Sequence, residues 1–119
     1  MWTLSIESLG PWPLLRLSGH LVQGPPAEAL TATVRDLIAQ GRSNIVCVAT
    51  DVSVIDSTGT GVLVSVRDMT HRAGGRFILC APSKRLLNVL TTTHLMEVFE
   101  IVSDEAAALE TLQAPYTGT

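Results

Sequence analysis

The chain of 119 residues is poor in charge, in aromatic side chains and in cysteine. Charged residues make up 16% of it and Phe, Trp and Tyr together 4%, whereas hydrophobic residues make up 46%, so aliphatic side chains must fill the core of a folded domain. The net charge of −3 provides no electrostatic footprint for direct nucleic-acid binding. No apolar run approaches the roughly 18 residues of a membrane span, and no charged segment precedes an apolar one at the start. These absences predict a single cytoplasmic domain without a membrane span.

The two cysteines, Cys47 and Cys80, each lie inside an apolar run, over residues 45–49 and 77–81. The sequence has no CxxC motif and no Cys/His cluster, so we expect no metal site. Free cysteines in apolar runs are typically small core residues. The alternative left open is a redox pair, which requires Cα atoms within about 7 Å, a separation that neighbouring strands can provide.

Alternating apolar runs and amphipathic segments predict an α/β fold with a mixed, mainly parallel sheet, an N-terminal antiparallel hairpin and about four helices. The expected strands cover 2–7, 14–18, 45–49, 76–81 and 98–102. The expected helices cover 27–40, 57–73, 82–90 and the segment capped by Ser103. Residues 1–113 are expected to form one domain, and 114–119 a flexible C-terminal tail.

The most informative segment is Ile-Asp-Ser-Thr-Gly-Thr-Gly-Val-Leu at 55–63, where an apolar strand passes into a helix. Ser57 occupies the expected N-cap, so its hydroxyl is exposed and a phosphate on it would face the positive end of the helix. The plainer alternative is a helix cap and nothing more. A nucleophile elbow requires Gly-x-Ser-x-Gly, but Ile55 stands two residues before Ser57. The Gly-x-Gly at Gly59 and Gly61 lacks the lysine of a phosphate-binding loop, so we predict no enzyme, no catalytic residue and no cofactor.

The pattern over 51–63, continued through 72–80, 86–90 and 95–99, resembles the STAS family, the anti-sigma factor antagonists. The resemblance covers nearly the whole chain and implies a phosphoprotein of transcription regulation. It implies phosphorylation at Ser57, or less favourably at Thr58. It also implies that the partner binds the turn made by Asp56, Ser57, Thr58, Gly59, Thr60 and Gly61.

The mechanism that this resemblance implies is partner switching. The unmodified antagonist binds an anti-sigma factor, a GHKL-type serine kinase, and a sigma factor is released. Phosphorylation by the kinase ends binding, and a PP2C-type phosphatase restores it. The expected oligomeric state is a monomer or a weak dimer, in which an exposed strand over 2–7 provides the contact.

Two positions depart from the family pattern, because Val22 and Val48 stand where relatives that serve as kinase substrates often carry an acidic residue or Asn. The departures favour a second hypothesis, a STAS scaffold that never cycles, such as the small subunit of a lipid-transport ABC system that docks on an ATPase. A third hypothesis, a ligand or redox sensor, rests on Cys47 and Cys80.

Overall fold

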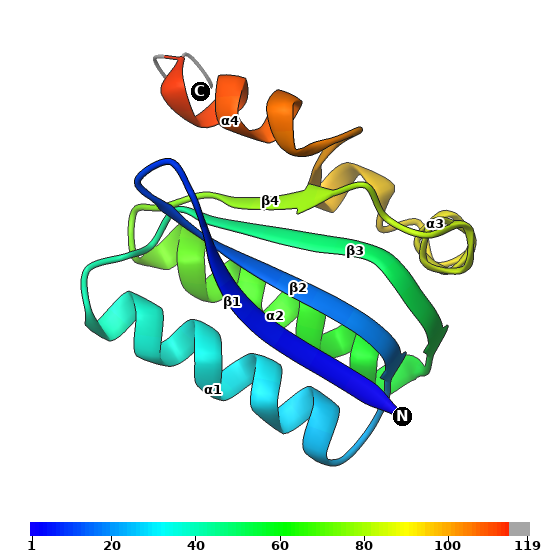
Figure 1. Ribbon diagram of the computed structural model, residues 1–119. Helices are drawn as coiled ribbons and strands as arrows, with labels where there is room; N and C mark the ends of the chain where they lie inside the picture. Colours follow the sequence, from blue (N-terminus) through cyan, green and yellow to red (C-terminus); the bar gives the residue numbers. More distant parts are fainter. Residues whose placement is uncertain (115–119) are drawn as a thin grey trace.

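A mixed five-stranded sheet in the order β1-β2-β3-β4-β5 organises the computed structural model, which describes residues 1–114 (Figure 1). β1 and β2 form an antiparallel hairpin, and every later neighbour pair is parallel. The elements are β1 (Trp2–Leu9), β2 (Trp12–Leu21), α1 (Pro25–Ala39), β3 (Ile45–Ile55), α2 (Ser57–Arg72), β4 (Phe77–Cys80), α3 (Lys84–Thr92), a 3₁₀ turn (Met96–Val98), β5 (Glu100–Val102) and α4 (Glu105–Gln113). The predicted fold class is thus confirmed.

The sheet lies between two unequal helical layers. α1 and α2 cover one face side by side, and α4 covers part of the other (Figure 1). The larger core cluster joins the sheet to α1 and α2 through residues such as Leu30, Val34 and Leu63. The smaller cluster lies beneath α4 and includes Val46 and Ala108. No helix within residues 1–114 combines the length and the apolar character needed to cross a membrane.

Three strands extend further than the sequence predicted, β1 by two residues to Leu9, and β2 and β3 by more. β2 was expected to stop before Gly19, but its pairing with β3 continues to Leu21 across an irregularity that follows Gly19. Gly19 has φ of +78°, and a side chain at this position would collide with the backbone of Met1. β3 continues to Ile55, with Val52 buried between the exposed Asp51 and Ser53. The continuous apolar signal ends at residue 49, and beyond it Val52 is the one buried residue of β3.

The helix boundaries also needed correction. α1 begins at Pro25, two residues before the predicted start, with prolines in its first turn, where they remove no helical hydrogen bond. α4 is capped by Asp104, not by Ser103, because the Asp104 carboxylate accepts a hydrogen bond from the Ala107 N–H at 2.8 Å. Of the predicted tail over 114–119, residues 115–119 lie outside the described part of the chain.

Candidate functional site

The predicted turn lies at the carboxyl ends of the parallel strands, where β3 passes into α2. The beginning of α1, after β2, lies at the same end of the molecule, so the N-termini of the two helices are neighbours there (Figure 1). In open α/β sheets this edge is the usual place for binding, because the loops that leave the strands converge on it.

Asp56, not Ser57, caps α2. One oxygen of its carboxylate accepts a hydrogen bond from the Gly59 N–H at 2.7 Å, and the other accepts from the Gln23 N–H at 3.0 Å. The backbone N–H groups of Gln23 and then Gly59 lower the pKa of the Asp56 carboxyl. The carboxylate therefore connects the segment before α1 to the first turn of α2, and Ser57 becomes the first residue of the helix.

Replacing Asp56 with alanine is expected to lower the melting temperature, and Asp56→Asn is expected to lower it less, because the amide keeps one acceptor oxygen. A carboxyl whose pKa is lowered on folding stabilises the native state above its unfolded pKa, and this contribution disappears as the pH falls through the folded pKa. The difference in melting temperature between wild type and Asp56→Asn should therefore be largest near neutral pH and shrink toward strongly acid pH. Calorimetry across that range measures it, and a difference independent of pH would contradict the capping role.

The six predicted binding residues divide into an exposed and a supporting group. Ser57, Thr58 and Gly61 are exposed, whereas Gly59 and Thr60 are buried. The Thr60 hydroxyl donates to the Asp56 carbonyl at 3.0 Å, and the Cα of Gly59 packs against the Leu21 carbonyl. Thus Asp56 and the two buried residues fix the backbone, and the exposed hydroxyls of the other group remain open to a partner or to modification.

The surface next to these hydroxyls includes a groove that the sequence did not reveal. Thr58 and Val62 line it on α2, and Ala27 and Thr31 line it on α1, around a volume of about 510 Å³. These residues come from segments about 30 positions apart, so no local motif marks the groove. The hydrogen bond from Gln23 to Asp56 was missed for the same reason.

The two departures from the family pattern have different surroundings. Val22 directly follows β2 and is half-buried, next to Gln23, whose N–H binds Asp56. Val48 is only 4% exposed and belongs to the core cluster beneath α4, well before the end of β3. Only Val22 therefore lies close to the Ser57 turn, and Val48 is a core residue.

The fold does not support a redox pair. Both cysteines are free and buried, and Val48, not Cys47, is the register partner of Cys80. Because successive side chains on a strand point to opposite faces, Cys47 lies in the α1–α2 core and Cys80 in the core beneath α4. Burial raises the pKa of Cys47 to about 12 and that of Cys80 to about 11, which disfavours the reactive thiolates. Both thiols are core residues.

Comparison with known proteins agrees with this architecture. Residues 6–108 match the model of the STAS domain. A candidate anti-sigma factor antagonist of Thermotoga neapolitana is 33% identical over 78 residues, which are 66% of this chain and 69% of that protein. The anti-sigma-B factor antagonist of Bacillus subtilis is 35% identical over 75 residues, 63% of this chain and 68% of that protein.

Solved structures of the Bacillus anti-sigma factor antagonist SpoIIAA share the fold. The unphosphorylated form has a TM-score of 0.75 and 22% identity, covering 95% of this chain and 100% of SpoIIAA. The phosphorylated form has a TM-score of 0.73 and 23% identity, covering 93% and 100%. The matched domain, the sheet order and the Asp-Ser-Thr-Gly turn at the start of α2 lead to one conclusion: this chain belongs to the STAS domain family.

Proposed function

We propose that this chain is a cytoplasmic anti-sigma factor antagonist, which binds an anti-sigma factor through the exposed residues at the start of α2 and loses that binding when Ser57 is phosphorylated. The observation that carries the proposal is the position of Ser57. Its side chain is exposed on the first residue of α2, while Asp56 and Gly59 hold the backbone beneath it. Relatives named as anti-sigma factor antagonists support the general role.

The physical basis is a local change of charge. A phosphate adds about −1.5 to −2 charges at pH 7, and the helix N-terminus tolerates it, so the free fold is little affected. The adjacent Asp56 carboxylate already accepts two backbone N–H groups and, in the described part of the chain, takes part in no ion pair. In an interface, the phosphate would have to lose water beside this carboxylate, which opposes binding. The switch therefore requires little movement of the backbone.

The proposed partners follow the family mechanism. The anti-sigma factor is a GHKL-type kinase that binds the unmodified chain, releases a sigma factor and then transfers phosphate to Ser57, and a PP2C-type phosphatase removes it. The groove lined by Thr58 and Val62 continues the same surface onto α1 and enlarges the area that a partner can contact.

Val22 favours a second candidate, a STAS scaffold that is never phosphorylated, such as the small subunit of a lipid-transport ABC system. Its half-buried, apolar side chain lies beside the Ser57 turn. At the position of Val22, many kinase substrates of the family carry an acidic residue. Recovery of an ATPase rather than a kinase in a pull-down would favour this candidate.

The deciding experiment is phosphorylation by purified anti-sigma kinases with ATP, followed by mass-spectrometric mapping. We expect one phosphate on Ser57 of the wild type, none on Ser57→Ala, and one on Thr58→Ala, the matched control at the neighbouring exposed hydroxyl. Modification of Thr58 alone, or of neither residue by a kinase that binds the chain, would contradict the proposed switch.

A further inference from the structure

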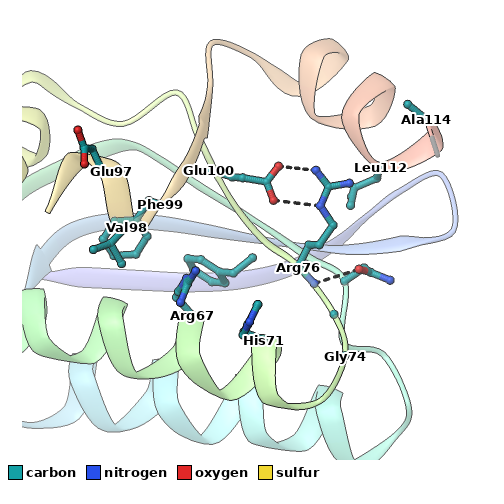
Figure 2. Close-up of a pocket in the computed structure, with 13 residues that line it drawn as sticks. Arg67, His71, Gly74, Arg76, Glu97, Val98, Phe99, Glu100, Leu112 and Ala114 are labelled. Atoms are coloured by element: carbon teal, nitrogen blue, oxygen red, sulfur yellow. Dashed lines mark hydrogen bonds and ion pairs between the residues drawn. The ribbon is translucent and has the colours of Figure 1, made fainter. Parts of the chain in front are cut away.

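A second cavity lies at the opposite end of the molecule from Ser57. It has a volume of about 720 Å³ and opens between the last turns of α2, the beginning of β4, the segment 97–100 and the end of α4 (Figure 2). Small-molecule sites typically have volumes of about 300–1,000 Å³, so a compact organic ligand fits.

One wall of the cavity carries an arginine and a histidine. Arg67 and His71 are four residues apart on α2, so they share a helical face, and Figure 2 shows both projecting toward the strands. Within residues 1–114, the one carboxylate that forms an ion pair with Arg67 is that of its neighbour Asp68, at 3.2 Å, with the two side chains 34% and 48% exposed. Such an exposed pair stabilises little, so a ligand anion can replace it.

The rest of the lining is largely apolar. Phe77 and Phe99 have ring centroids 6.5 Å apart with an angle of 56° between the rings, and both are almost fully buried. Half-buried Val98 and Leu112 extend this apolar surface toward the opening. An aromatic or branched apolar body can contact these side chains while an attached anion reaches α2.

The acidic residues around the cavity do not oppose an anion strongly. The Glu100 carboxylate is neutralised by Arg76, which binds both of its oxygens and also donates to the Thr111 carbonyl of α4 at 3.2 Å. Figure 2 shows the Glu97 carboxylate pointing away from Arg67 and His71. The ion pair between Arg76, directly before β4, and Glu100 of β5 thus supports the wall without adding net charge.

From this arrangement we propose that the cavity binds a small organic anion, with an aromatic or branched apolar body on Phe99, Val98 and Leu112, and a carboxylate, sulfonate or phosphate at Arg67 and His71. The site is independent of the proposed switch, because His71 lies 14 residues after Ser57, or ~21 Å along α2 at about 1.5 Å per residue. A ligand here leaves the partner surface uncovered.

The test is titration of the intact chain with anilinonaphthalene sulfonate, an aromatic anion, and with neutral phenylnaphthylamine, followed by fluorescence and amide NMR shifts. We expect the anion to shift amides around Arg67, His71 and Val98, and Arg67→Gln to weaken its binding roughly tenfold. His71→Gln should act in the same direction, and Arg72→Gln, an exposed cation on the same helix outside the cavity, should have no effect.

Shifts confined to another surface would overturn the proposal, as would equal binding of the neutral probe or equal effects of Arg67→Gln and Arg72→Gln. None of these results depends on phosphorylation of Ser57, so the two proposals fail separately. Thermal melting of each variant identifies any loss of folding, and His71→Gln provides an independent test if Arg67→Gln unfolds.

Discussion

Replacing Gly59 with alanine is expected to lower the free energy of unfolding by about 2–4 kcal/mol, because the fold has no room for a side chain there. A Cβ at this position would lie under 3.0 Å from the Leu21 carbonyl oxygen and 3.1 Å from Ile55 Cγ1. The Leu21 carbonyl belongs to the backbone of β2, which pairs with β3 at Ile55, so it cannot move without disturbing the parallel pairing at the end of the sheet. The obstacle is thus a rigid one.

Gly61→Ala is the matched control for this prediction. The same addition meets nothing within 4 Å, and Gly61 is exposed within the same helix. Alanine favours helix over glycine by about 0.5–1 kcal/mol, so this variant should be slightly more stable than the wild type. Denaturant unfolding followed by circular dichroism measures both. Equal changes in the unfolding free energy of the two variants would show that the close contact between α2 and β2 does not exclude a side chain at Gly59.

The sequence predicted those features that depend on residues close to one another along the chain. The helix start near Ser57, the hairpin and the buried strands each produce a local pattern of apolar and polar side chains. The identity of the N-cap was predicted wrongly, because Asp and Ser are both good caps and a hydrogen bond from Gln23, 33 positions earlier, favours Asp56.

Strand register and long-range packing explain the other differences between the prediction and the structure. Cys47 and Cys80 occupy neighbouring strands, as predicted, but a one-residue difference in register places them on opposite faces of the sheet. The cavity at the end of α2 draws its lining from Asn44 to Ala114, and no segment of the sequence indicates it. Such features arise only from the packing of the whole chain.

Ser57→Asp is expected to weaken binding to the anti-sigma factor by at least about 30-fold, which corresponds to roughly 2 kcal/mol. Phosphorylation of Ser57 is expected to weaken the same binding by up to about 1,000-fold. The added carboxylate would have to lose water beside Asp56, whose oxygens are already occupied by the Gln23 and Gly59 N–H groups. The unfolding free energy should not fall, because an acidic residue in the first turn interacts favourably with the helix dipole by about 0.3–1 kcal/mol. A loss of affinity without a loss of stability is therefore the signature of the switch.

Two controls separate charge at the interface from other causes. Ser57→Ala removes the hydroxyl without adding charge, and we expect it to bind within a fewfold of the wild type. Ser8→Asp adds the same charge to an exposed position near the β1–β2 turn, far from α2's first residue, and should leave affinity unchanged. Calorimetric titration of the three variants with one purified anti-sigma factor provides the comparison. If Ser57→Asp bound as tightly as Ser57→Ala, a charge at the start of α2 would not control the partner, and the scaffold role favoured by Val22 would become the better explanation.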